Sequence, residues 1–311
     1  MNARFLLVKI GRALLTLWLV VSFAFVVLRV TGDPIETMLG DQADPAVLEH
    51  YRKLYGFDKP LHEQYLRYFV GVARADFGIS IADDRPVVAV IADALPATLQ
   101  LGASALAVAL ILGLPLGIIA ALNRNKALDR FVMTFAVLGF SIPNFFLGIL
   151  LILVFSMWLR VLPSSGTGTP WHVVMPAVTL GAAIAGSLAR FTRTSLLDVL
   201  NKNYMRTAAA KGVPRERRIL AHALPNAAIP LLTVLGFRIG DLVAGAIVTE
   251  TVFAWPGVGR LLISSVARRD LAVVQGVLIW AAFAMVITNL TVDLLYGWID
   301  PRVRTVARRS A

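Results

Sequence analysis

Long stretches without a charged side chain recur along the chain and indicate helices that cross a membrane. Such runs cover residues 13–28, 94–123, 131–159, 161–189 and 271–292. A bilayer core of about 30 Å requires about 20 apolar residues in helical conformation, so the pattern predicts one spanning helix in each run. The fourth run opens with the turn-rich stretch LPSSGTGTP, and its helix is therefore expected to begin near Trp171.

A further hydrophobic stretch, from about residue 223 to residue 252, is interrupted by Arg238, Asp241 and Glu250. With this stretch included, the pattern predicts six transmembrane helices. The fold class expected is therefore an all-α membrane protein. Pro and Gly residues punctuate its helices, where they allow close helix packing or a break beside a cavity.

Polar segments divide the chain into three parts. Residues 1–30 hold a short basic end and the first helix, which is expected to be retained because no small-x-small cleavage site follows it. Residues 31–95 are rich in acidic side chains and are expected to form a small extracytoplasmic region. Residues 96–311 hold five further helices, with a basic cytoplasmic segment over residues 198–226.

Lys and Arg residues gather on one predicted side of the membrane. They strongly outnumber acidic residues in the N-terminal end, in residues 123–130, in residues 190–218 and in the C-terminal tail. Cytoplasmic loops are enriched in Lys and Arg, so both termini are predicted to be cytoplasmic and residues 31–95 to lie outside.

The composition supports the membrane class. Hydrophobic residues make up 58% of the chain and charged residues 16%, and the mean hydropathy is +0.74. The net charge of +11 would suit nucleic acid in a soluble protein, but the positive-inside pattern accounts for it here. The chain contains no cysteine, which excludes disulfides, thiolate metal ligands and cysteine nucleophiles.

Motifs for enzymatic chemistry are absent from the sequence. It has no GxxxxGK[ST] phosphate-binding loop, no HExxH and no GxSxG, and its four histidines are scattered. We therefore expect no catalytic residue, no metal site and no cofactor bound by this chain itself.

A basic stretch, YMRTAAAKGVPRERRILAHALPNAAIP at residues 204–230, stands out within this apolar chain. Gly212 is suited to end one helix in a left-handed conformation, and Pro214 is suited to the first turn of the next. The pattern predicts a short amphipathic helix with a basic face. Composition alone fits equally well a basic anchor that lies on anionic lipid.

The same stretch resembles the cytoplasmic coupling loop of ABC importer permeases, in which Glu-Ala-Ala, three residues, Gly, nine residues, Ile, one residue and Leu-Pro follow one another. Aligned on Gly212, the motif places Arg206 at the position of its carboxylate. Further stretches resemble the dipeptide, oligopeptide and nickel permease branch of the family, and together they extend over nearly the whole chain. They are TGDPIETMLGDQADP (31–45), YGFDKPLHEQYLRYF (55–69), DFGIS (76–80), LPATLQLG (95–102), ETVFAWPGVGRLL (250–262) and VDLLYGWIDPRVR (292–304).

The resemblance implies a type I importer permease of the bacterial inner membrane that does not hydrolyse ATP. Its partners would be a second homologous permease subunit, two cytoplasmic ABC ATPase subunits that bind ATP and Mg, and an extracytoplasmic solute-binding protein. The ATPase would contact the short helix around Gly212. By position in the motif, the coupling residues would be Arg206, Thr207, Ala208, Ala209, Lys211, Gly212, His222, Leu224 and Pro225.

Charged and amide side chains within the predicted spans are candidates for the translocation path. An ionisable residue is costly at membrane depth, so its presence there indicates a functional role. Arg238 and Asp241 lie three residues apart and could line the path or form a structural ion pair. Glu250 could line the path or cap the turn at AWPG, where Pro256 and Gly257 suit a type II turn. Asn289 is a further candidate.

The function predicted is ATP-driven import of a small peptide or related solute delivered by a binding protein. An ion-coupled secondary transporter that uses Arg238 and Asp241, and a membrane scaffold without transport activity, are the alternatives. Neither accounts for the glycine-hinged segment together with the outer-loop motifs. The substrate (dipeptide, oligopeptide, glutathione-like conjugate, opine or nickel chelate) is left open by the sequence.

Overall fold

Four uninterrupted helices are long and apolar enough to cross a membrane. The computed structural model describes residues 3–30, 35–36, 44–55, 57–244 and 246–299, and among them it contains helices and one isolated bridge between Ile79 and Pro86. The four helices are α1 (Ala3–Val30), α5 (Val87–Leu122), α8 (Val174–Leu200) and α14 (Leu271–Ile299). Each coincides with a predicted span, and α8 follows a short 3-10 turn, η2 (Pro170–Val173), near the expected start.

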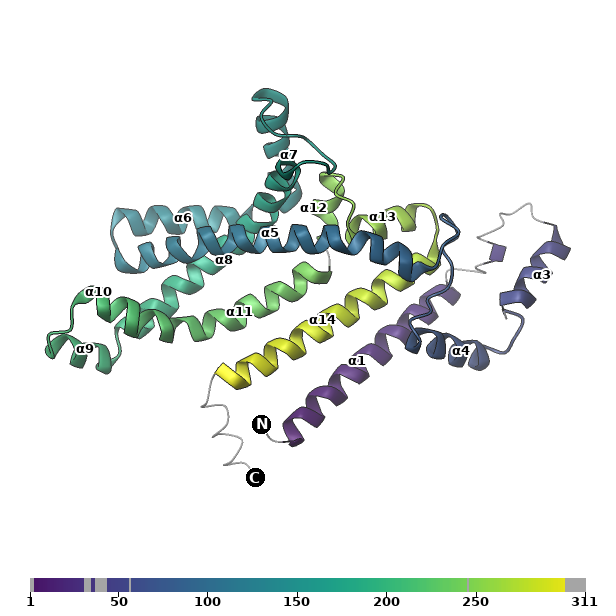
Figure 1. Cartoon of the computed structure of the whole chain (residues 1–311), viewed down its shortest axis with the longest axis horizontal. Coiled ribbons are helices and arrows are strands. Elements are labelled where there is room, and N and C mark those ends of the chain that lie inside the picture. Colours follow the sequence, from purple (N-terminus) through teal and green to yellow (C-terminus); the bar gives the residue numbers. More distant parts are fainter. Residues whose placement is uncertain (1–2, 31–34, 37–43, 56, 245, 300–311) are drawn as a thin grey trace.

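The third predicted span is not a single straight helix. It consists of α6 (Ala127–Ser141), α7 (Asn144–Leu151) and a π-helical turn, η1 (Ile152–Trp158), with a bend of 102° between α6 and the α7–η1 pair. Pro143 causes the break, because a proline lacks the amide N–H and forces the preceding residue out of helical geometry. Ile142 accordingly adopts φ −75° and ψ 124°. In Figure 1 the α7 segment projects away from the other helices.

The fifth predicted span also differs in extent. Helical geometry continues from α10 (Arg215–Arg217) through the π turn η3 (Arg218–Ala223) into α11 (Leu224–Ala244), with a bend of 41° between Arg215–Ala228 and Pro230–Gly240. The prediction that it reaches residue 252 is wrong, because Ile247–Val252 forms a separate short helix, α12. With each bent pair counted as one span, the structure has up to six spans, in agreement with the predicted all-α membrane fold.

The helix core depends on small residues. Gly113 and Gly117 of α5 lie directly against the backbone of Ala185 and Ala189 in α8, where a β-carbon would not fit. Gly236 of α11 lies against the side chain of Val292 in α14, which leaves no room for a β-carbon either. Such small residues let membrane helices approach closely, and α5, α8 and α11 therefore pack side by side (Figure 1).

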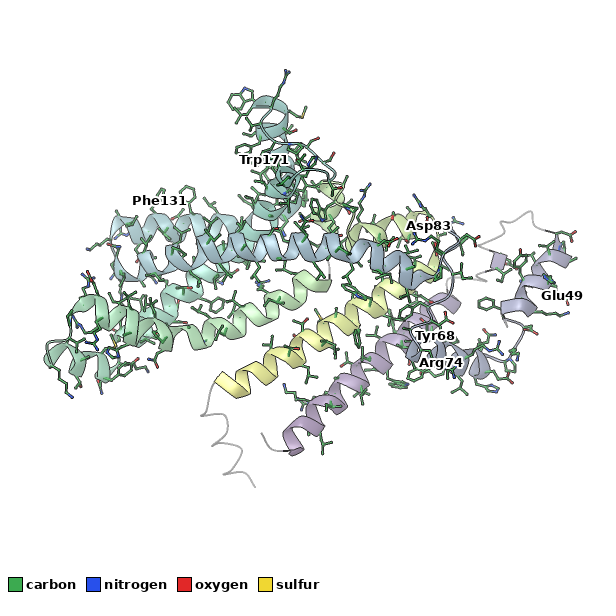
Figure 2. All side chains as sticks on the ribbon, in the orientation of Figure 1. Glu49, Tyr68, Arg74, Asp83, Phe131 and Trp171 are labelled. Carbon is green, nitrogen blue, oxygen red and sulfur yellow. The ribbon has the colours of Figure 1, made fainter. Side chains whose placement is uncertain are left out.

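The side chains on the outside of this core are apolar. Phe131 of α6 is 61% exposed and points away from the neighbouring helices (Figure 2). Large exposed apolar side chains also cover α1 and η1. In a soluble protein such a surface would be a liability, whereas in a bilayer it is the surface expected to face lipid or another subunit.

The shorter helices lie at the two ends of the helix assembly. At one end are α3 (Pro45–Tyr55), α4 (Leu61–Ala73) and α13 (Val258–Ala267); at the other are α9 (Asn203–Ala210) and α10 (Figure 1). The Tyr65 hydroxyl of α4 is 2.8 Å from the Ser22 hydroxyl of α1, which ties α4 to the first span. The sequence boundary placed at residue 95 falls inside α5, which begins at Val87.

Candidate functional site

The segment that follows α8 contains a short helix closed by a glycine. α9 ends at Ala210, and Gly212 adopts φ +76°. The Gly212 N–H donates to the Ala209 carbonyl (3.0 Å), and the Val213 N–H donates to the Ala208 carbonyl (3.1 Å). These two bonds form a Schellman motif, which pairs the carbonyls that a helix end leaves free. The prediction that Gly212 supplies a left-handed cap is confirmed.

A new helix starts directly after this cap and continues into the membrane. Pro214 is the residue before α10 and has extended geometry (φ −54°, ψ 145°), rather than the first helical position predicted for it. The helix passes through Pro225 without a break. The π turn of η3 precedes this proline, and its wider spacing of carbonyls accommodates a residue that lacks an N–H. The carbonyl of His222 accepts a bond from the Asn226 side chain (2.7 Å).

One buried side chain holds the short helix against the ends of the spans. Met205 of α9 is 4% exposed and belongs to an apolar cluster with Ala121 of α5, Leu196 of α8 and Ala223 of η3. Burying a methionine of this kind contributes about 1.5–3 kcal/mol. The cluster therefore connects α9 to three helices at one end of the molecule.

The residues predicted for the coupling segment lie together on the outside of this assembly. Two of them, Ala208 and Leu224, are half-buried. The others are exposed: Arg206, Thr207, Ala209, Lys211, Gly212, His222 and Pro225. The accessible face of α9 thus carries Arg206 and small side chains together with Tyr204, while Met205 forms its buried face.

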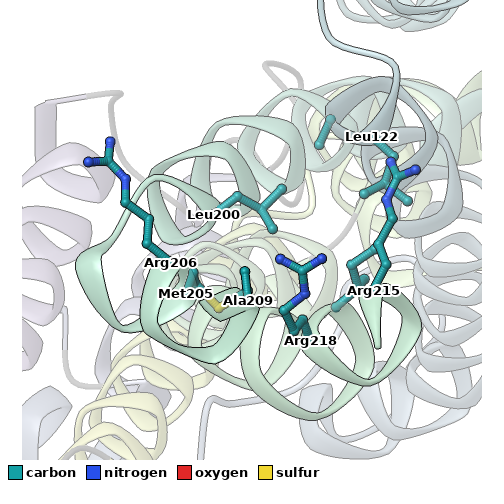
Figure 3. Close-up of a pocket in the computed structure, with 9 residues that line it drawn as sticks. Leu122, Leu200, Met205, Arg206, Ala209, Arg215 and Arg218 are labelled. Carbon is teal, nitrogen blue, oxygen red and sulfur yellow. The ribbon is translucent and has the colours of Figure 1, made fainter. Parts of the chain in front are cut away.

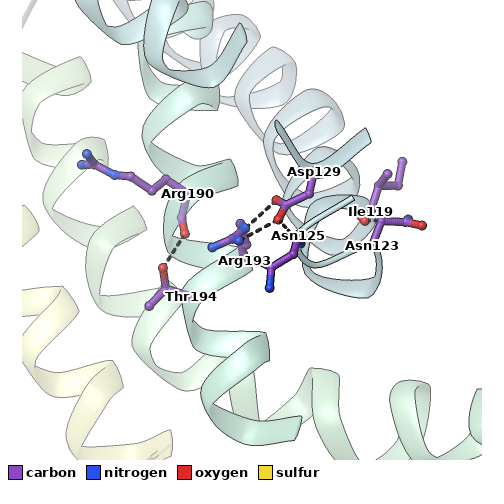
Figure 4. A network of polar contacts seen from close by, with 7 residues as sticks. All are labelled: Ile119, Asn123, Asn125, Asp129, Arg190, Arg193 and Thr194. Carbon is purple, nitrogen blue, oxygen red and sulfur yellow. Dashed lines mark hydrogen bonds and ion pairs between the residues drawn. The ribbon is translucent and has the colours of Figure 1, made fainter. Parts of the chain in front are cut away.

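An ion pair between a buried carboxylate and a half-buried guanidinium joins α6 to α8, and the sequence does not predict it. Asp129, at the start of α6, is 3% exposed and accepts two bonds of 2.7 Å from the guanidinium of Arg193 in α8. The Asn125 N–H also donates to Asp129 (2.9 Å), as Figure 4 shows. In the sequence, Asp129 and Arg193 fall within two basic segments, residues 123–130 and 190–218, and nothing in either segment indicates that they pair. Their bidentate pairing fixes the start of α6 against α8.

Glu250 is completely buried and its carboxylate is fully engaged. Oε1 accepts a bond from the Thr98 hydroxyl (2.9 Å), and Oε2 accepts one from the Arg260 N–H (3.0 Å). Arg260 is the third residue of α13, so the carboxylate pairs one of the free N–H groups at that helix start. This geometry favours the capping role that was one of the two predicted for Glu250.

The turn beside Glu250 is not the predicted type II turn. Gly257 has φ −98° and ψ 177°, which is extended backbone open to any residue. Glycine is required at residue 257 because a β-carbon there would collide with the Glu250 carboxylate, and at residue 259 because a β-carbon would collide with the Ile247 backbone. Trp255 completes the cluster, because its indole N–H donates to the Ala97 carbonyl (2.7 Å).

The remaining path candidates lie on α11 and α14. Arg238 is half-buried on α11, and Asn289 is half-buried on α14, with its side-chain oxygen near Gly240. The side chain of Asp241 lies outside the described residues, so its pairing with Arg238 stays a prediction. Asn289 therefore lies on the side of α14 that faces α11.

Asp270 is a further buried carboxylate, and like Asp129 it is not among the residues predicted from the sequence. It holds together the opposite end of the molecule. Asp270 is 1% exposed and caps α14 through the Val273 N–H (3.2 Å). Its other oxygen accepts bonds from the Ser80 hydroxyl (2.6 Å) and the Ala82 N–H (3.2 Å). An aspartate directly before an apolar run is a helix-cap signal, and this could have identified it.

Comparison with known proteins decides the family. A family model described as "Binding-protein-dependent transport system inner membrane component" matches residues 113–305, and a model of the N-terminal part of such components matches residues 2–102. The chain is 44% identical over 290 residues to the glutathione transport system permease protein GsiC of Escherichia coli strain K12. That alignment covers 93% of this chain and 95% of the relative.

The chain belongs to the binding-protein-dependent permeases of ABC importers. The permease has the same identity and coverage with GsiC of Shigella dysenteriae serotype 1. The predicted family, the function as a permease subunit of an ABC importer and the location in the bacterial inner membrane are thereby confirmed. The family is one of transport proteins rather than enzymes.

Solved structures show the same fold for the permease. An inward-facing form of the MetNI methionine ABC transporter aligns with a TM-score of 0.59 and 19% identity, over 68% of this chain and 96% of that chain. An amino acid ABC transporter crystallised with histidines aligns with a TM-score of 0.51, over 69% of this chain and 94% of that chain. At this level of identity the likeness concerns the fold alone.

Proposed function

We propose that this permease imports a small peptide or a related solute such as glutathione, itself a tripeptide. The proposal is supported by the 44% identity to a glutathione permease across almost the full length of both chains. A binding protein outside the membrane would deliver the solute to the end that carries α3, α4 and α13. The choice between glutathione, dipeptides and longer peptides would depend largely on that binding protein.

The energy would come from separate subunits. Two ATPase subunits would bind ATP and Mg. A second homologous permease would pair with this chain, and the translocation path would lie between the two permeases. The termini and α9 would face the cytoplasm, as the distribution of Lys and Arg indicates. In this arrangement α9 lies where a cytoplasmic ATPase can reach it.

The observation that carries the coupling proposal is the continuous helical segment from Arg215 to Ala228, which enters α11 and bends by 41° at Pro230. α9 is joined to it by the short connection at Gly212 and is packed against it through Met205. Movement of α9 by an ATPase would therefore be passed as a rigid body to residues 215–228, the part of this helix before the bend. A two-state element of this kind is what transmission between distant sites requires.

Gly212 offers a selective test, because a β-carbon there would meet no neighbouring atom within 4 Å. Only the backbone conformation opposes substitution. A β-branched residue should destabilise this conformation by about 1–2 kcal/mol, whereas asparagine tolerates the left-handed region. We expect Gly212→Val to lose most of the solute-stimulated ATP hydrolysis of the reconstituted importer, and Gly212→Asn to retain most of it.

Co-purification of the ATPase subunits with each variant serves as the control for assembly. Equal stimulated hydrolysis in the Gly212→Val complex and the parent would contradict coupling through this segment. Uptake of labelled glutathione and of labelled dipeptide by the parent complex separately tests the substrate class.

A further inference from the structure

α8 continues well beyond the apolar part of its sequence. The helix contains no charged residue before Arg190, yet it ends only at Leu200. Residues 190–200, which we call the arm of α8, add about 16 Å of helix to the charge-free part. α9 begins at Asn203, directly after the arm. The arm therefore carries α9 at its end.

The end of the arm is packed closely against α9. Leu196 is completely buried in the apolar cluster that contains Met205 of α9, and Leu200 packs against the same cluster, beside the cavity drawn in Figure 3. Two residues connect the helices, and the Lys202 N–H donates to the Val199 carbonyl (3.0 Å). A displacement of α9 would therefore displace the arm as well as η3.

The ion pair between Asp129 and Arg193 lies near the other end of the arm. Nε and Nη2 of Arg193 donate to the two carboxylate oxygens of Asp129 at the start of α6, each at 2.7 Å (Figure 4). Asp129 also accepts a bond from the N–H of Asn125, which has a left-handed φ of +65° in the turn between α5 and α6. The carboxylate thus connects this turn, α6 and the arm.

Elsewhere α6 and α8 meet through small residues. Gly186 of α8 lies directly against the backbone of Ala136, and Gly139 of α6 lies close to the backbone of Ala182. Helices packed in this way come close together and can slide past one another by small amounts. Among the described residues, the pair at Asp129 is the one ion pair between α6 and α8, and its two parallel bonds fix their relative position.

We propose that Asp129 and Arg193 are positioning residues that make α6 follow α8 when an ATPase subunit moves α9. The displacement passes from α9 to the arm, and through the ion pair to α6 and the α5–α6 turn. This route is separate from the one through Gly212 and η3. The inference rests on the proposed function, because it requires an ATPase that acts on α9.

Reconstituted importer complexes with Asp129→Asn or Arg193→Lys test this role. The first variant keeps the shape of the side chain and removes its charge, whereas the second keeps the charge and loses the paired bonds. We expect both to retain the ATPase subunits. The ratio of solute-stimulated to basal ATP hydrolysis should fall about tenfold, since a charge-assisted hydrogen bond is lost. Arg130→Gln, at the next and exposed residue of α6, is the matched control and should keep the ratio of the parent.

A covalent link between α6 and α8 distinguishes positioning from folding. Val137 of α6 and Arg190 of α8 are exposed and line the same small groove. The chain has no cysteine, so Val137→Cys and Arg190→Cys can be joined by a bifunctional maleimide in the Asp129→Asn background. We expect the linked complex to regain the stimulation ratio of the linked parent, and the unlinked complex to stay deficient.

Equal stimulation ratios in Asp129→Asn and the parent would overturn the proposal. A deficit that the link does not repair would overturn it too, as would failure of both variants to bind the ATPase subunits, because the pair would then serve the fold alone. A parent complex without solute stimulation would instead contradict the proposed function itself, so the two failures are distinguishable.

Discussion

The carboxylate of Glu250 holds three segments together, since it lies on α12 and accepts bonds from Thr98 of α5 and Arg260 of α13. Replacing it with alanine leaves two buried donors without a partner. We predict that Glu250→Ala destabilises the permease by about 1–3 kcal/mol. Glu250→Gln should cost less, because its amide oxygen can still accept from the Arg260 N–H. Thermal unfolding in detergent measures both.

Glu63→Ala on α4 is a suitable control, because Glu63 is exposed and its substitution should change stability by less than about 0.5 kcal/mol. The experiment also separates the two roles predicted for Glu250. Loss of transport with unchanged thermal stability would show that Glu250 acts in the translocation path rather than as a cap.

At the scale of elements, Asp270 joins the start of α14 to the loop before α5. Ser80 is 1% exposed, donates to Asp270 and accepts a bond from the Asp83 N–H (3.1 Å). Ser80→Ala removes both bonds at little steric cost. We predict about fivefold faster hydrogen exchange in residues 80–86, the change expected from about 1 kcal/mol of lost local stability.

Arg85→Ala in the same loop should change this exchange much less, because its ion pair with Asp93 is exposed. If Ser80→Ala exchanged like the parent, the loop would be held by its packing and not by Asp270. The comparison is local and does not require transport activity.

Element boundaries show where sequence reasoning succeeds and fails. Charge-free runs identify α1, α5, α8 and α14, because length and hydrophobicity are sufficient to define a continuous span. They do not reveal the 102° bend at Pro143, since tertiary contacts decide whether a proline only bends a helix or redirects it. Pro225 shows the opposite result, because a π turn absorbs it and the helix continues.

The sequence predicts those features of the candidate site that depend on residues close together in the chain. Gly212 follows from turn chemistry, and the basic character of Arg206 and Lys211 follows from the charge pattern. The contacts of Asp129 with Arg193, and of Asp270 with Ser80, join residues far apart in the chain. No local pattern contains such pairs, so a single sequence could not supply them.

At the scale of the whole molecule, orientation in the membrane is the prediction on which the coupling proposal depends. α4 and α9 lie at opposite ends of the helix assembly (Figure 1). The chain has no cysteine, so single cysteines can be introduced without removing any. We predict that a membrane-impermeant maleimide labels Asp58→Cys and Asp83→Cys in right-side-out membrane vesicles. Lys126→Cys and Lys202→Cys should react only after permeabilisation.

All four positions are exposed, so differences in labelling report the side of the membrane and not burial. The parent chain provides the unlabelled background. Labelling of Lys202→Cys in sealed vesicles would place α9 outside the cell, where no cytoplasmic ATPase could contact it. That result would exclude coupling through Gly212 while leaving the family assignment unaffected, because the family assignment does not depend on the orientation.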